Sequence, residues 1–384
     1  MSNDQLNVTV LNSAVGFIKR EGHEFLFAYG AGQDFPGEDS FVSLTMPVRH
    51  RGYLQSNLHP IFEMHLPEGY LRSVIVKQFA KLVDVSDFGL LKLMSPSLKG
   101  RLAFNNANQN QHLVELDELL NPSSPELFSE LITRYALSSP LSGVQPKVIA
   151  PVSNKATLSV DDYIVKAWGT DYPELALNEY FCMRAVQMAN VPVPTFYLSN
   201  DDALFIMKRF DLTETDAPLG FEDMCVLQGK PSQKKYDGSY EGIVKTLRTF
   251  CASQYLKSSI EQFFKMVVLN NLLKNGDAHL KNFGVIYETA DTVRLAPAYD
   301  VISTTAYIKN DMSALLLAGS KRWWSIEQLV SVGVQSFDLS QKRAEELVGE
   351  CLAGVSSAKE EVRLRLAGET NAHKIRILEH FLEL

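Results

Sequence analysis

The sequence predicts an α+β protein with two lobes, the first rich in strands and the second helical, and with an additional N-terminal subdomain. Three observations predict this fold class. The chain has 384 residues, which suffices for two or three domains of ordinary size. Short β-prone runs bounded by Gly, Pro and Asp occupy much of residues 1–105 and 136–212. From about residue 240 the pattern is mainly helical.

These observations divide the chain into four parts. They are the N-terminal subdomain at 1–105, a linker with connecting helices at 106–135, the strand-rich lobe at 136–212 and the helical lobe at 213–384. Residues 105–112 are rich in Asn and Gln, which indicates a loop or linker. The main expected elements are helices at 69–83, 126–135, 174–190 and 260–274, strands at 147–151, 163–167, 195–198 and 204–210, and a hairpin at 283–287 and 292–295.

The composition excludes several classes of protein. The 37 Lys and Arg against 45 Asp and Glu give a net charge of −8, which argues against nucleic acid held by charge alone. The four cysteines lie far apart, which argues against a zinc site and a disulfide framework. No signal peptide is visible, and no apolar run approaches the roughly 20 residues of a membrane helix. We therefore expect a cytoplasmic protein without a membrane partner.

The most informative segment lies between residues 274 and 300. Asp277 and Asn282 are separated by four residues, and Asp300 follows just beyond the expected hairpin. Phosphoryl transfer from ATP needs an Asp that accepts the proton of the acceptor hydroxyl, and an Asn and a second Asp that hold Mg²⁺. Protein kinases use the same Asp-x-x-x-x-Asn spacing. A hairpin between Asn282 and Asp300 would bring the two metal ligands together.

The other parts of such a site lie upstream, in the order that a kinase N-lobe requires. Lys166 stands in an expected strand, where its ammonium can reach the α- and β-phosphates. Glu179, in the next helix, is either the ion-pair partner of Lys166 or an exposed charge. Residues 204–210 have the position of a hinge strand that contacts adenine. Residues 142–147 have the position of the phosphate loop, although they are not Gly-rich.

At these residues the sequence resembles the HipA-like family, bacterial Ser/Thr kinases that act as toxins of HipBA-type toxin–antitoxin pairs. The similarity covers nearly the whole chain. The matching motifs are SLTMP at 43–47, FEMHLPEG at 62–69, SGVQPK at 142–147, NEY at 178–180, KRFD at 208–211, EDMC at 222–225, KY at 235–236, GSYEG at 238–242, DAHLKN at 277–282 and YD at 299–300. The resemblance implies a protein-kinase-like fold that uses ATP and Mg²⁺.

The resemblance also implies roles for the matching residues. Asp277 becomes the catalytic base, and Asn282 and Asp300 become the Mg²⁺ ligands. Lys281 either assists the transferring phosphate or is a solvated lysine, and His279 is either a nucleotide contact or a structural loop histidine. The implied nucleotide-binding residues are Ser142, Gly143, Val144, Gln145, Lys147, Lys166, Met207, Lys208, Phe210, His279 and Tyr299.

A serine in or just before the phosphate loop is often autophosphorylated in this family, which ejects the loop and inactivates the kinase. Position 140, where some relatives carry that serine, is Pro140 in this chain. Ser142 matches the serine that other relatives carry within the loop, and it is the autophosphorylation candidate; Ser138 and Ser139 lie slightly earlier. The alternative for Ser142 is a hydroxyl that caps a turn.

Known substrates of the family include aminoacyl-tRNA synthetases, and the usual partner is a small helix-turn-helix antitoxin of the HipB type. DNA would then be reached only through the antitoxin. Three alternatives stay open at this point. They are a small-molecule or lipid kinase of the same fold, a non-catalytic co-repressor module for a DNA-binding antitoxin, and a HipA-like kinase that has lost toxicity or serves signalling.

Overall fold

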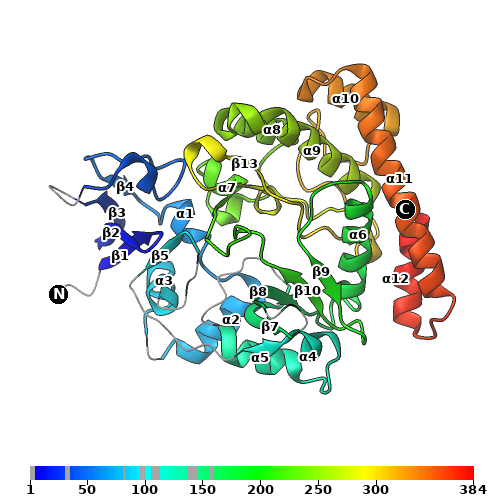
Figure 1. Cartoon of the computed structure of the whole chain (residues 1–384), viewed down its shortest axis with the longest axis horizontal. Coiled ribbons are helices and arrows are strands. Elements are labelled where there is room, and N and C mark those ends of the chain that lie inside the picture. Colours follow the sequence, from blue (N-terminus) through cyan, green and yellow to red (C-terminus); the bar gives the residue numbers. More distant parts are fainter. Residues whose placement is uncertain are drawn as a thin grey trace.

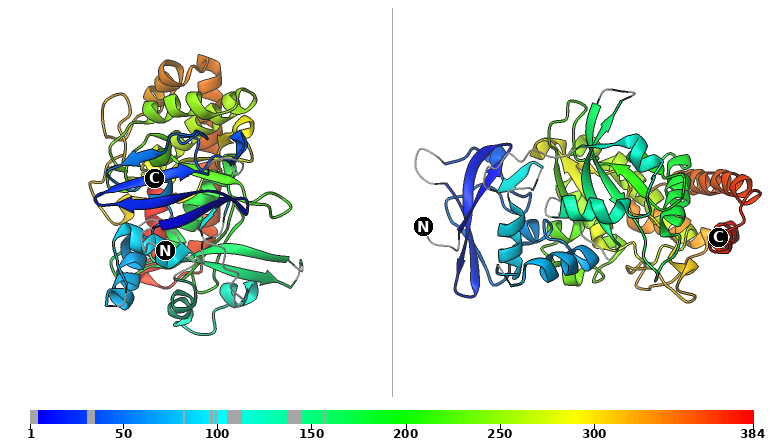
Figure 2. Two further views of the ribbon diagram at one scale, coloured as in Figure 1. Left: turned by 90° about the vertical axis from the view of Figure 1, so that its left-hand side faces the viewer. Right: turned by 90° about the horizontal axis from the view of Figure 1, so that it is seen from below.

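The computed structural model describes residues 5–30, 35–81, 83–95, 98, 100–104, 113–136, 145–155, 157 and 159–384. Three β-sheets follow one another in chain order, and long helices gather toward the C-terminal end (Figure 1). The N-terminal sheet lies at one end of the molecule and the two C-terminal helices at the other (Figure 2). The predicted α+β class is confirmed.

The N-terminal sheet is antiparallel, with strand order β4-β3-β2-β1-β5. Its strands are β1 (Gln5–Val10), β2 (Ser13–Glu21), β3 (Glu24–Tyr29), β4 (Tyr53–Gln55) and β5 (Leu102–Phe104). Leu6 and Val8 alternate with exposed residues along β1, as a half-buried strand requires. The helices of this subdomain are α1 (Pro60–Glu63), α2 (Gly69–Phe79) and α3 (Asp87–Met94). The helix expected at 69–83 therefore ends earlier.

The second sheet has the order β6-β7-β8-β10-β9. Its strands are β6 (Val114–Glu115), β7 (Lys147–Asn154), β8 (Ser159–Lys166), β9 (Phe196–Leu198) and β10 (Phe205–Lys208), with helices α4 (Leu116–Leu120), α5 (Leu127–Tyr135) and α6 (Leu175–Met188). β7 and β8 extend beyond the expected 147–151 and 163–167. Pro151 does not end β7, because β6 pairs only with Val152 and Ser153 and leaves an open edge beside Pro151.

The third sheet, β11-β12-β13, lies in the helical lobe. Its strands are β11 (Gly220–Asp223), β12 (Gly284–Tyr287) and β13 (Arg294–Leu295). The expected hairpin is therefore present, and β11 adds a strand that the sequence pattern did not indicate. The helices of this lobe are α7 (Met224–Leu227), α8 (Tyr240–Phe250), α9 (Ser253–Leu272), α10 (Ile326–Phe337), α11 (Gln341–Leu366) and α12 (Ala372–Glu383).

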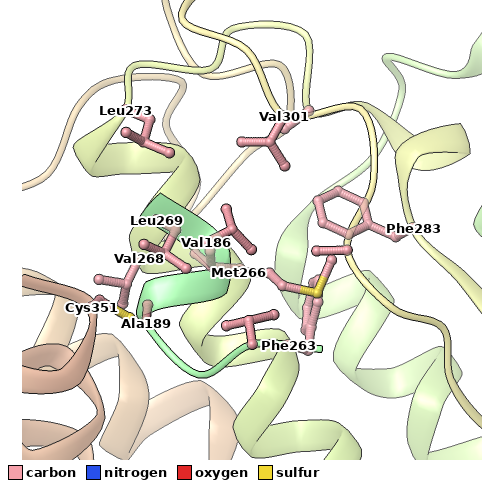
Figure 3. Packing of buried hydrophobic residues seen from close by; sticks show 14 of the residues in the cluster. Val186, Ala189, Phe263, Met266, Val268, Leu269, Leu273, Phe283, Val301 and Cys351 are labelled. Carbon is pink, nitrogen blue, oxygen red and sulfur yellow. The ribbon is translucent and has the colours of Figure 1, made fainter. Parts of the chain in front are cut away.

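Two hydrophobic clusters make up most of the core. One runs without interruption from the N-terminal sheet to β7 and β8 and contains Leu6 and Val165, so the subdomain and the strand-rich lobe share a core. The other surrounds α9 (Figure 3). Phe283 and Val301 are buried in the second cluster, and they directly follow Asn282 and Asp300 in the chain. Packing of these two hydrophobic residues therefore fixes the backbone beside both predicted metal ligands.

Candidate active site

A buried group of charges lies where β8, α6 and the segment after β13 meet. Lys166, the last residue of β8, places its Nζ 2.5 Å from Glu179 Oε1 and 2.6 Å from Asp300 Oδ1. The side chains of Lys166 and Glu179 are 3% and 0% exposed. Burial alone would lower the pKa of Lys166, but Asp300 and Glu179 outweigh this effect and raise the pKa. The same lysine holds the pKa of Asp300 well below its usual range despite burial.

A second lysine lies beside this group and has no counter-ion among the residues that the structure describes. Lys147 begins β7 and pairs directly with Lys166, so the two side chains lie on one face of the sheet. Lys147 is only 7% exposed, and burial lowers its pKa. No carboxylate among the described residues lies within ion-pair distance of its ammonium. Lys147 is therefore a desolvated cation that an anion can neutralise.

The loop from Asp277 to Asn282 is held by hydrogen bonds from both of its ends and from a neighbouring loop. Asn282 Nδ2 donates to the Asp277 carbonyl at 2.8 Å, and Tyr299 Oη donates to the Lys281 carbonyl at 2.8 Å. Tyr236 Oη donates to Asp277 Oδ1 at 2.5 Å. The Asp277 side chain remains 41% exposed, so it faces the surroundings rather than the protein interior.

The pKa of Asp277 is raised mainly by partial burial. The hydrogen bond from Tyr236 lowers it, while the charge of Asp300 raises it further. His279 lies with Nε2 4.0 Å from Asp277 Oδ1, and burial lowers its pKa to about 3. His279 is therefore neutral at physiological pH and packs edge-on against Tyr236.

A cleft lined by all three parts of the fold contains Lys147, Lys166 and Asp300 in its wall. Phe210 and Tyr299 stack with their ring centroids 5.2 Å apart, and Met207 lies in the same wall. The N-terminal subdomain contributes a further wall with Val42, Ile61, Met64, His65 and Arg101. Apolar walls with two lysines and an aspartate at one end suit a flat heterocycle that carries anionic groups.

The structure brings eight of the sixteen predicted site residues to the wall of this cleft. Those that line it are Lys147, Lys166, Met207, Phe210, Lys281, Asn282, Tyr299 and Asp300. Gln145, Asp277 and His279 are not in its wall, and Lys208 turns its ammonium to Asp161 at 2.7 Å. Ser142, Gly143 and Val144 lie outside the described residues.

Two residues beside the site, Glu68 and Tyr236, were not predicted. Tyr236 and Glu68 lie in motifs that carried the family resemblance, but no spacing rule assigned them a role. Asp223 caps the start of α7 by accepting the Val226 N–H, and it also lines the cleft. Glu68 and Tyr236 come from distant segments, so the signal for these two residues was only their place in matching motifs.

Comparisons with known proteins agree with this arrangement. A model of the HipA-like C-terminal domain matches residues 139–359, and a model of the HipA N-terminal domain matches residues 6–105. The chain belongs to the HipA-like family. The family predicted from the sequence is confirmed.

The HipA-like chain is 28% identical over 280 residues to "Putative kinase Y4dM" of Sinorhizobium fredii, an alignment that covers 67% of the chain and 65% of that protein. It is 27% identical over 244 residues to a Haemophilus influenzae protein whose name likewise calls it a kinase, covering 58% of the chain and 71% of that protein. The chain thus spans about two thirds of the length of these relatives.

The fold also matches a solved structure, the toxin–antitoxin complex of HipA, HipB and operator DNA from Shewanella oneidensis MR-1. The TM-score is 0.69 and the sequence identity 17%, over 98% of this chain and 95% of the matched one. This likeness shows that the two-lobed fold with its N-terminal subdomain is shared. Within the described part of the HipA-like chain, every helix is too short or too polar to cross a bilayer.

Proposed function

We propose that this HipA-like protein is a kinase that transfers the γ-phosphoryl group of ATP to a serine or threonine of a protein. The observation that carries the proposal is the group of buried charges at one end of the cleft. Lys166 is held between Glu179 and Asp300, and Lys147 lies beside them without a counter-ion among the described residues. An unpaired buried cation is unfavourable unless an anion joins it, and nucleotide phosphates supply that anion. The kinase names of the relatives support the same activity.

The lining of the cleft supports one orientation of the nucleotide. The adenine would lie among Met207, Phe210 and Tyr299, where flat apolar surface is available. The phosphates would then extend toward Lys147 and Lys166, which lie on one face of the sheet.

Asn282 and Asp300 would hold Mg²⁺, and their free atoms fit the ion. Asn282 uses Nδ2 for the Asp277 carbonyl, and its Oδ1 accepts no hydrogen bond from the described residues. Asp300 binds Lys166 through Oδ1, and its Oδ2 accepts no hydrogen bond within the described part of the chain. Hard oxygen ligands suit Mg²⁺, which takes its remaining ligands from phosphates and water. When bound, the ion neutralises charge on the phosphates.

Asp277 would act on the acceptor hydroxyl. Its Oδ1 is occupied by Tyr236, so Oδ2 is the atom that can accept the proton. The hydroxyl oxygen forms a bond to the γ-phosphorus while the bond from that phosphorus to the bridging oxygen breaks, and ADP leaves with the electron pair. Lys147 and Lys166 stabilise the charge that develops on ADP.

The physiological context of the reaction is proposed from family resemblance. The Shewanella complex contains HipB and operator DNA, and we propose an antitoxin of that kind as the partner of this chain. Ser142 stays the proposed site of inactivating autophosphorylation, and an aminoacyl-tRNA synthetase stays the proposed acceptor.

The test compares the wild-type protein with Asp277→Asn and with Asp237→Asn as the matched control, since Asp237 is an exposed acid of the loop beside Asp277. Each protein receives radiolabelled MgATP and a phosphatase-treated bacterial extract. We expect protein-bound label with the wild type and the control, and at least about a 1,000-fold slower rate with Asp277→Asn. ATP consumption without labelled protein would overturn the protein acceptor, and full activity of Asp277→Asn would overturn the mechanism.

A further inference from the structure

The N-terminal subdomain reaches the loop that carries Asp277. Glu68, at the start of α2, places Oε1 2.6 Å from Lys281 Nζ and Oε2 3.5 Å from Lys235 Nζ. Glu63, at the end of α1, accepts the Ser232 N–H at 3.2 Å. Two carboxylates of one subdomain therefore bind the loop at 231–236 and the loop at 277–282.

Glu68 and Lys281 form a largely desolvated ion pair. The Lys281 side chain is 3% exposed, and its ammonium also donates to Ser232 Oγ at 3.1 Å. Burial alone would raise the pKa of Glu68, but Lys281 outweighs this effect and the pKa is lowered. Burial likewise acts to lower the pKa of Lys281, but Asp223 and Glu68 raise it. Both groups therefore stay charged at neutral pH, and removal of one leaves a buried charge without its partner.

The same loops hold Asp277. The Lys235 carbonyl accepts the Leu280 N–H at 3.0 Å, and the adjacent Tyr236 donates to Asp277 Oδ1. A connected set of bonds therefore runs from Glu68 through Lys235 and Lys281 to the two sides of Asp277. The bond from Lys281 to Glu68 joins residues 213 positions apart in the sequence, so it forms only when the subdomain is docked.

We propose that Glu68 is a positioning residue for phosphoryl transfer, through which the docked N-terminal subdomain orients Asp277. This proposal rests on the proposed function above. Glu68 holds the Lys281 ammonium away from the reacting groups and fixes the loop that carries Tyr236. Without it, Lys281 turns to another carboxylate such as Asp223, and the loop at 277–282 loses its orientation. A displacement of about 1 Å of a catalytic group costs on the order of 100-fold in rate.

The experiment uses the full chain, radiolabelled MgATP and the phosphatase-treated extract. Glu68→Gln is compared with Glu21→Gln, a matched control whose carboxylate in the same subdomain lies 2.8 Å from Lys19 but is exposed. We expect Glu68→Gln to lower the maximal rate of labelling by about 10- to 100-fold, whereas the ATP concentration for half-maximal rate changes by less than about threefold. Glu21→Gln should match the wild type.

Two further variants separate positioning from a loss of structure. Lys281→Met should lower the maximal rate, and adding Glu68→Gln to it should lower the rate little more, since both changes break one contact. Additive losses, or an equal weakening of ATP binding, would overturn the positioning role. A wild-type rate for Glu68→Gln with an active wild type would overturn this inference alone. An inactive wild type would overturn it together with the proposed function.

Discussion

Two neighbouring regions differ in burial and in the kind of contact that holds them. They are the end of the cleft at Lys166, where we propose that the phosphates bind (the phosphate end), and the loop of Asp277 outside the cleft wall, where we propose that the acceptor binds (the acceptor end). At the phosphate end, Lys166 is 3% exposed and its two carboxylate partners come from the elements that frame the cleft. At the acceptor end, Asp277 is 41% exposed and is held by a tyrosine hydroxyl. Buried ion pairs fix one end rigidly, whereas loop contacts leave the other open to an acceptor.

The difference indicates where the binding energy and the acceptor selectivity of the proposed kinase site would arise. In the proposed reaction, charges at the phosphate end bind the part of the substrate that all ATP-dependent reactions share. The proposed protein acceptor is large, and the exposure of Asp277 is what such an acceptor would need in order to reach the proposed base. Its orientation instead depends on contacts from loops and from the N-terminal subdomain, which a partner protein can reach.

The largest expected effect is at the phosphate end. Lys166→Met leaves Glu179 and Asp300 buried without their counter-ion, so we expect the free energy of unfolding to fall by about 3–5 kcal/mol. MgATP binding should be lost with it. Denaturant unfolding and calorimetric titration with MgATP measure the two effects.

The control for Lys166→Met is Lys265→Met, because Lys265 is also buried and pairs with Glu350 at 2.7 Å. It should lose stability but keep MgATP binding. Equal ATP affinity of Lys166→Met and the wild type would show that the phosphates bind elsewhere.

Lys147→Met should have the opposite effect on stability. Because Lys147 is buried without a counter-ion among the described residues, its loss should leave the free energy of unfolding unchanged or higher by about 1 kcal/mol. ATP affinity should fall by about 10- to 100-fold, since a charge-assisted contact with the phosphates is lost.

Lys155→Met is the matched control, since Lys155 lies at the far end of the same hairpin and is 77% exposed. A large loss of stability for Lys147→Met, with unchanged ATP affinity, would show that this lysine has a structural partner rather than a phosphate.

The contrast between the two ends also explains what could be predicted from the sequence. Lys166, Glu179 and Asp300 could be predicted because each belongs to a local pattern. Lys166 lies in a strand, Glu179 in the next helix and Asp300 just after a hairpin. Glu68 and Tyr236 act across 213 and 41 residues of sequence, and no periodicity or spacing rule joins such positions. The family resemblance marked their motifs without indicating their contacts.

Prediction of the fold was limited in the same way, because local patterns do not reveal which distant segments pair. The predicted hairpin at 283–295 forms as β12 and β13, since the β-prone runs at 283–287 and 292–295 and the turn between them indicate it locally. β11 was missed because its pairing with β12 is made across more than sixty residues, from Gly220 opposite Tyr287. Strand ends were also missed at β7, where Pro151 is tolerated only because the neighbouring edge is open. Local patterns therefore predicted the elements better than their partners.

Tyr236→Phe tests the acceptor end by removing one hydroxyl. The hydrogen bond to Asp277 Oδ1 is lost, so we expect the maximal rate of protein labelling to fall by about 10-fold while the half-saturating ATP concentration stays the same. Tyr70→Phe is the control, because Tyr70 is similarly exposed, at 46%. A wild-type maximal rate for Tyr236→Phe would mean that Asp277 needs no orientation from this loop.

The smallest expected effect concerns how acid acts on the two ends. His59 caps the start of α1 by accepting the Ile61 N–H at Nδ1, and burial lowers its pKa to about 4. In the unfolded state His59 has a pKa near 6.5, so as pH falls it binds a proton there before it does in the folded state. The contribution of neutral His59 to stability is therefore complete above about pH 6.5 and is lost as pH falls toward 4.

Asp300 at the phosphate end has a lowered pKa and stays charged throughout this range. Acid should therefore loosen α1, and with it the contact from Glu63 to Ser232, before it affects the phosphate end. His59→Asn keeps an acceptor at the cap but cannot be protonated. Between pH 7 and pH 5 both proteins should lose stability. We expect the loss in free energy of unfolding to be about 1–2 kcal/mol smaller for His59→Asn than for the wild type. Parallel curves of unfolding free energy against pH for the two proteins would show that His59 has the same pKa in the folded and unfolded states. Acid would then not loosen α1 before it affects the phosphate end.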